Sequence, residues 1–127
     1  MASKKILVVS RDANVVSLLK LGLGRDFEVS AVGINEQGIL AVISQRKPDL
    51  IILEIVMPRG QEIILGLRIR QLSEVPLIML SVSGAEGVKV RKLSLEARDF
   101  LGENLTAPAL KEQIQEALSA QAQEKGP

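Results

Sequence analysis

The sequence predicts an α/β fold in which helices cover both faces of a parallel sheet. Short runs of Val, Ile and Leu alternate with longer stretches of helical periodicity along the chain, as expected for repeated strand–helix units. Several of these runs are apolar without polar alternation, which is typical of strands buried on both faces. The length of 127 residues fits one domain with one core.

Five strands are expected, each followed by a helix. The first, third and fourth strands are the runs without alternation. In chain order, the predicted strands are Ile6–Ser10, Phe27–Val32, Leu50–Ile55, Leu77–Val82 and Asp99–Gly102.

Polar caps and helix breakers predict where the helices begin and end. Asp12 is a good N-cap for a first helix that ends before Gly24. Asn35 can cap the second helix, and a fifth helix follows Thr106, with Pro108 tolerated in its first turn.

Each predicted helix directs apolar side chains toward the sheet. The fourth helix, expected over Glu86 to Glu96, has the weakest pattern. The residues expected to face the core are Val16, Leu19 and Leu23 in the first helix, Leu40 and Ile43 in the second, Ile64, Leu67 and Leu72 in the third, and Leu110, Ile114 and Leu118 in the fifth. The domain is expected to span residues 1–120, followed by a polar tail or linker stub over 121–127.

Composition excludes several classes of function. The chain has no Cys, His, Trp or Tyr, which removes disulfides, thiol and imidazole catalysis, and the usual nitrogen or sulfur metal ligands. With a net charge of +1 and only two Phe, direct nucleic-acid binding is disfavoured. No glycine-rich phosphate loop is present. We therefore expect no enzymatic activity, no metal and no cofactor.

The amino-terminal sequence indicates no membrane association. The apolar run Ile6 to Val9 is too short for a signal-peptide core or a membrane span. A cytoplasmic location is expected.

Four segments carry a resemblance to a known family. They are Lys5–Val9, Pro48–Pro58, Val75–Ser81 and Ala97–Leu101. In order and spacing they resemble the CheY-like receiver domain of response regulators, over about residues 4–119. The resemblance implies a flavodoxin-like (βα)5 three-layer sandwich with a five-stranded parallel sheet of order 2-1-3-4-5. It also implies a role in two-component signal transduction or transcription regulation.

The sequence departs from the family at the residues that receivers use for phosphorylation. Receivers accept a phosphoryl group on an aspartate after the third strand, and Glu54 stands at that position. The two acidic residues that hold Mg²⁺ are matched by Ser10 and Arg11, and only the next residue, Asp12, is acidic. Glu103 replaces the family's lysine. Arg11 offers no acceptor atom to a metal, and the extra methylene of Glu54 displaces its carboxylate from in-line transfer. Together these changes predict a degenerate pseudo-receiver, a protein-interaction module that works without phosphorylation.

Two other functions stay open from the residues alone. One is a working phospho-acceptor that uses Asp12, and the other is a small-molecule sensor in which Arg11 contacts an anion. Ser81 and Phe100 match the family's hydroxyl and aromatic positions, although the favoured explanations are a strand-end hydroxyl satisfied by the backbone and an aromatic side chain in the core or at its rim. Two carboxylates at one pocket need either a nearby cation or a raised pKa, and we expect the Arg11 guanidinium within salt-bridge reach of Glu54 or Glu103.

A protein partner or a second copy is expected to bind the fourth helix, fifth strand and fifth helix, the face that receivers commonly use. A basic rim around apolar residues of the fourth helix supports this, although those apolar residues could instead face the sheet. One subfamily forms a symmetric dimer here through complementary charges, and the fifth-helix position of that set is Gln113, which puts that dimer in doubt. The residues of this predicted face are Lys89, Arg91, Lys92, Asp99 and Gln113.

Overall fold

The computed structural model describes residues 3–33, 36–55, 62–83, 89–93, 103–105 and 107–124. The strands are β1 (Lys5–Val9), β2 (Glu28–Val32), β3 (Leu50–Glu54), β4 (Leu77–Ser83), β5 (Lys89–Leu93) and β6 (Glu103–Leu105). The helices are α1 (Ala13–Leu23), α2 (Glu36–Arg46), α3 (Glu62–Leu72) and α4 (Ala107–Glu124).

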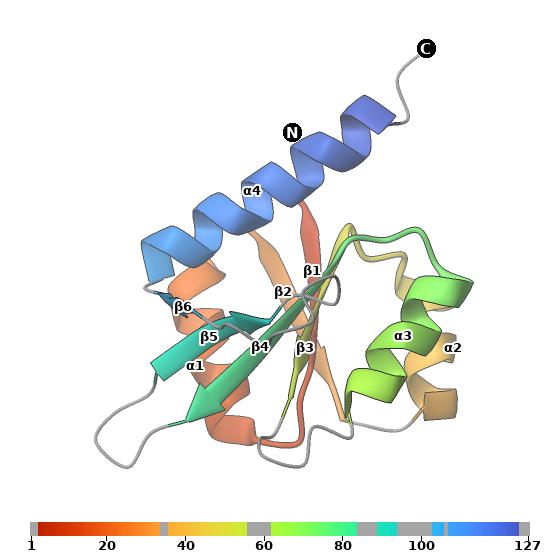
Figure 1. Cartoon of the computed structure of the whole chain (residues 1–127), viewed down its shortest axis with the longest axis horizontal. Coiled ribbons are helices and arrows are strands. Elements are labelled where there is room, and N and C mark those ends of the chain that lie inside the picture. The colour runs from red at the N-terminus through yellow and green to blue at the C-terminus, as the bar shows by residue number, and fades with distance from the viewer. Residues whose placement is uncertain are drawn as a thin grey trace.

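The strands of the described part form one sheet in the order β2-β1-β3-β4-β5-β6 (Figure 1). Strands β1 to β4 are parallel to their neighbours. Strand β5 runs antiparallel to β4, and β6 runs antiparallel to β5. The parallel order 2-1-3-4 agrees with the prediction. The predicted all-parallel sheet of five strands is wrong, because β5 and β6 run antiparallel to their neighbours.

The fourth helix predicted over Glu86 to Glu96 is wrong, because Lys89–Leu93 forms strand β5. The sequence gives a physical reason. Gly84 and Gly87 have low helix propensity and favour turns, and the β-branched Val90 favours a strand. A hairpin partner for β4 therefore competes well with a short helix. The predicted strand Asp99–Gly102 lies outside the described residues, and β6 begins directly after it.

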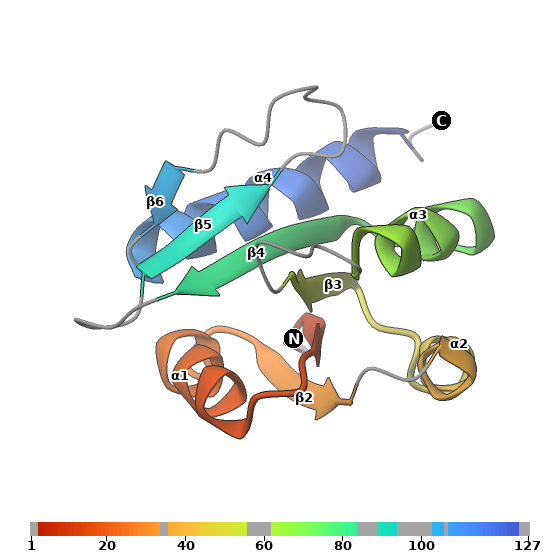
Figure 2. The same cartoon turned by 60° about the horizontal axis from the view of Figure 1, so that its bottom comes forward.

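Helices cover both faces of the sheet, as predicted (Figures 1 and 2). One core cluster contains side chains of α1 and α4, and the other contains side chains of α2 and α3. Strand β3 lies between them and is buried at all five positions. Burying one Leu or Ile side chain stabilises a fold by about 1.5–3 kcal/mol. The unbroken apolar run of β3 therefore reflects packing on both faces.

Helices α1, α2 and α4 pack against the sheet through the faces that carry their predicted core residues. In α1, Leu19 and Leu23 are buried as predicted, together with Val15, and Val16 packs against them from a half-buried position. In α4, Leu110 and Ile114 are buried and Leu118 packs against their cluster. In α2, Ile39 is the buried residue, while Ile43 packs beside it and Leu40 is half-buried.

Helix α3 packs through a different face from the predicted one. Its buried side chains are Leu65 and Ile69, four residues apart. Between them, Gly66 allows a close approach, since a Cβ there would lie 3.2 Å from both Leu53 Cδ2 and Met79 Sδ. The residues predicted to be in the core are instead 65%, 48% and 67% exposed; they are Ile64, Leu67 and Leu72. Apolar residues occupy both sides of this helix, so periodicity did not determine which side faces the sheet.

Helix α4 continues to Glu124, past the domain end expected at residue 120; the domain boundary stays a prediction. Among the described residues, no helix combines the length and apolarity that a membrane span requires.

Candidate functional site

The candidate site lies where β1 and β3 end side by side. These parallel strands are in register, with Val9 opposite Leu53. Ser10 follows β1 and Glu54 ends β3, so the two residues after that register pair are neighbours across the sheet. Each is only 5% exposed, and they are the buried polar residues of the described part.

Ser10 and Glu54 are joined by a buried hydrogen bond. The Ser10 hydroxyl donates to Glu54 Oε1 over 2.7 Å. The same Ser10 Oγ accepts from the backbone N–H of Asp12 over 3.0 Å, which fixes the hydroxyl oxygen. A buried carboxylate without hydrogen-bond donors is costly. Ser10 therefore compensates in part for the burial of Glu54 with a neutral group.

Asp12 has a structural task at the start of α1. Its Oδ1 accepts a hydrogen bond from the backbone N–H of Asn14 over 2.8 Å, and its extended backbone makes it the N-cap. The predicted cap is confirmed. This contact directs the Asp12 carboxylate toward the first turn of α1, where it satisfies a helix N–H group.

The Arg11 side chain is exposed. Within the described part of the chain, Glu54 contacts Ser10 and no ion pair joins it to Arg11, so that half of the predicted salt bridge is wrong. The chain bends at Arg11, just after the end of β1, and the bend is held by the hydrogen bond from the Asp12 backbone N–H to the Ser10 hydroxyl. Ser10 is the residue that bonds Glu54, and exposure spares the Arg11 guanidinium the cost of desolvation.

The other predicted pocket residues lie in different places. Ser81 is on β4, directly after the register partner of Glu54, which is Leu80. Glu103 begins β6, and β4 and β5 stand between that strand and β3. The sheet order therefore does not bring Glu103 beside Glu54. Phe100 lies outside the described residues.

The predicted partner face is also rearranged. Lys89, Arg91 and Lys92 lie on β5 rather than on a helix. Gln113 is half-buried on α4, and Asp99 lies outside the described residues.

The residues at this site do not fit the Mg²⁺ ion that receivers bind. Mg²⁺ requires several oxygen ligands in nearly octahedral geometry. Here the Glu54 carboxylate accepts from Ser10, the Asp12 carboxylate caps α1, and Arg11 has no acceptor atom. Among the described residues, no three acidic side chains lie close enough together to hold a metal ion.

Comparison with known proteins identifies the family. The response regulator receiver domain matches residues 6–119. The chain belongs to the response-regulator receiver family. It is 30% identical to the phosphate regulon transcriptional regulatory protein PhoB of Pseudomonas aeruginosa, over 100% of this chain and 55% of that protein. It is 34% identical to the alkaline phosphatase synthesis regulator PhoP of Bacillus subtilis, over 78% of this chain and 42% of that protein.

The relatives place this receiver among two-component response regulators. Most are named as transcriptional regulators, while one, from Caulobacter vibrioides, is named a protein-glutamate methylesterase/protein-glutamine glutaminase. The chain spans about half the length, or less, of the curated relatives it matches.

Solved structures show the same fold. The receiver domain of a LuxO repressor protein from Vibrio parahaemolyticus has a TM-score of 0.67 and 20% identity, with coverage of 98% of this chain and 96% of that one. The N-terminal domain of the nisin resistance regulator NsrR has a TM-score of 0.67 and 25% identity, with coverage of 92% and 99%.

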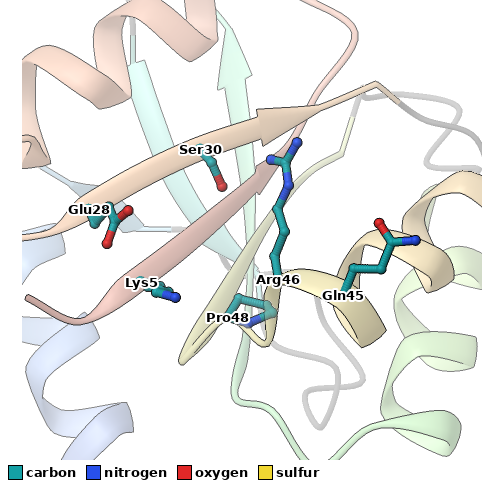
Figure 3. A pocket seen from close by; sticks show the side chains of 6 residues that line it. All are labelled: Lys5, Glu28, Ser30, Gln45, Arg46 and Pro48. Carbon is teal, nitrogen blue, oxygen red and sulfur yellow. The ribbon is translucent and has the colours of Figure 1, made fainter.

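This receiver also has a cavity at the opposite end of the strands, which sequence reasoning missed (Figure 3). Its volume is about 310 Å³, and its lining residues are Lys5, Glu28, Ser30, Gln45, Arg46 and Pro48. They come from the start of β1, the edge strand β2, the end of α2 and, for Pro48, the connection between α2 and β3. No local spacing connects these segments, so only the folded chain brings them together.

Proposed function

We propose that this chain is a pseudo-receiver, which retains the receiver fold as a protein-interaction module and does not use a phosphoryl switch. The observation that carries this proposal is the buried hydrogen bond between Ser10 and Glu54.

Phosphoryl transfer in this fold requires an acceptor oxygen in line with the leaving group and a metal that neutralises the developing charge. Here Glu54 is 5% exposed and one of its oxygens accepts from a hydroxyl that occupies an acidic position of the family. The neutral hydroxyl donates one hydrogen bond to the carboxylate, but it supplies neither a metal ligand of negative charge nor a cation to neutralise a transferring phosphoryl group. The site is therefore suited to holding one loop conformation.

The test is treatment with acetyl phosphate and Mg²⁺, followed by intact-mass measurement. We expect the wild-type chain to gain no phosphoryl group, while a receiver with the complete acidic set gains one in the same reaction. The Asp12→Asn variant controls for the remaining acceptor candidate. A phosphoryl adduct on the wild-type chain would contradict the proposal, and its loss in Asp12→Asn would identify the acceptor.

We further propose that the interaction surface is the side formed by β5, β6 and α4. These elements lie together at one end of the sheet (Figures 1 and 2). Strand β5 carries three basic residues within five positions, and these can pair with acidic residues of a partner protein or with acidic residues elsewhere on a second copy of the chain. This surface replaces the predicted one, in which a helix carried those residues.

Charge reversal tests this surface through self-association. We expect Arg91→Glu/Lys92→Glu to weaken association of the chain with itself, measured by sedimentation velocity over a concentration series. The matched control is Lys20→Glu/Arg70→Glu, which reverses two exposed charges on α1 and α3 and should leave association unchanged. Equal sedimentation of both variants, or a wild-type chain that stays monomeric, would contradict self-association through this surface.

A further inference from the structure

The cavity at the amino ends of β1 and β2 lies far from the Ser10–Glu54 site. Lys5 begins β1 and Ser10 follows its end, a separation of about 16 Å at the rise of a β-strand. In Figure 3, Arg46 reaches from the end of α2 toward β2, and the Ser30 hydroxyl points into the same space. The cavity is therefore an independent feature of the fold.

The polar side chains of this cavity have no partners in the described part of the chain. Lys5 and Glu28 are register partners on neighbouring strands, yet no ion pair joins them. The hydrogen bonds between Lys5 and Asp49 use backbone atoms of Lys5: its N–H donates to Asp49 Oδ2, and its carbonyl oxygen accepts from the Asp49 backbone N–H. Ser30 and Arg46 likewise make no side-chain hydrogen bond with the described residues. Elsewhere the fold does pair such groups, as in the 2.7 Å ion pair of Lys111 with Asp26.

The charges of the cavity favour an anion with a second polar group. Lys5 and Arg46 supply two cations against the single carboxylate of Glu28. A guanidinium binds carboxylate or phosphate oxygens through two parallel N–H groups, and a hydroxyl such as that of Ser30 can add a third donor. The Glu28 carboxylate can accept only from a donor, such as a hydroxyl or an ammonium group of the ligand.

We propose that this cavity binds a small organic oxyanion, a carboxylate or phosphate that also carries a hydroxyl or ammonium donor. Arg46, Lys5 and Ser30 hold the oxyanion, and Glu28 accepts from the donor. A volume of about 310 Å³ lies at the lower limit for ligand sites, so the ligand is small. Through this site the receiver can respond to a ligand without using the residues at the carboxyl ends of its strands.

The test is a titration followed by two-dimensional amide NMR. The probes are inorganic phosphate, glycerol 3-phosphate and L-serine, which separate phosphate from carboxylate and a bare anion from one with a donor. We expect saturable shifts around Lys5, Ser30 and Arg46 with glycerol 3-phosphate or L-serine. Inorganic phosphate should bind more weakly than these two probes, because it carries no separate hydroxyl or ammonium group that can reach Glu28 while the oxyanion is bound.

Variants assign the contacts. Arg46→Gln should weaken binding by about tenfold or more, since a charge-assisted hydrogen bond is lost. The control Arg70→Gln removes an exposed arginine of α3 and should bind as the wild type does. Glu28→Gln should lower the affinity for glycerol 3-phosphate and L-serine, which carry a donor. Its affinity for inorganic phosphate should stay the same or increase.

Three results would overturn the proposal. They are the absence of saturable binding by every probe, shifts that lie away from the cavity, and equal affinity of Arg46→Gln and Arg70→Gln. If Arg46→Gln fails to fold, the position of the shifts in the wild-type chain still tests whether the probes bind at the cavity.

Discussion

Replacing Ser10 with aspartate is expected to destabilise the fold by about 2–4 kcal/mol at neutral pH. The change places a second carboxylate within hydrogen-bonding distance of the buried Glu54 carboxylate, where Ser10 now donates over 2.7 Å. Two like charges in a poorly hydrated site repel, and Glu54 also loses a donor. This loss is a large part of the 5–15 kcal/mol by which small domains are typically stable.

Urea unfolding at neutral and acidic pH measures this effect. A proton shared by the two carboxyl groups removes the repulsion, so the difference from the wild-type chain should shrink as pH falls. The matched control is Ser10→Asn, which has nearly the size of the aspartate and keeps a donor for Glu54; we expect a loss of about 1 kcal/mol. If both variants lost the same free energy of unfolding, the size of the side chain at position 10, and not its charge, would explain the destabilisation.

The main elements of the fold could be predicted because burial leaves a direct trace in the sequence. Strand β3 lacks polar residues before Glu54 because helices cover both of its faces. Asp12 was predictable as a cap because few side chains can satisfy a helix N–H group, and the structure shows that bond. The resemblance to receivers placed Ser10 and Glu54 in one pocket, which agrees with the rule that parallel strand ends meet at one edge of the sheet, although Arg11 was the residue expected beside Glu54.

The remaining features depend on contacts between distant segments. The burial of Leu65 rather than Leu67 on α3 follows from the place where Gly66 meets Leu53 and Met79. The residue types would allow either Ser10 or Arg11 to contact Glu54. The structure shows that Ser10 makes the contact and that the Arg11 side chain is exposed. Strand β5 forms because β4 offers it an edge, which a local helical pattern cannot reveal.

Replacing Leu53 with alanine is expected to lower the free energy of unfolding by about 2–5 kcal/mol. Leu53 is fully buried in β3, with Val9 and Met79 beside it in register on the neighbouring strands. The shorter side chain leaves a void next to Gly66 that a rigid sheet cannot fill. The matched control is Leu21→Ala on α1, where the side chain is 84% exposed and the expected change is below about 0.5 kcal/mol. Urea unfolding of both variants measures the difference, and similar losses would contradict the packing of β3.

A second substitution tests whether Gly66 and Leu53 share this space. In the wild-type chain, a Cβ at position 66 would meet Leu53 Cδ2 at 3.2 Å, which opposes the gain of about 1 kcal/mol that alanine has over glycine within a helix. In the Leu53→Ala background that contact is absent and the 3.2 Å contact with the flexible Met79 side chain remains, so Gly66→Ala should recover part of that gain of about 1 kcal/mol. The same Gly66→Ala change in the wild-type chain should gain less, because Leu53 must then shift. A gain of equal size in both backgrounds would show that the two positions are independent, and that something other than Leu53 determines how closely α3 approaches the sheet.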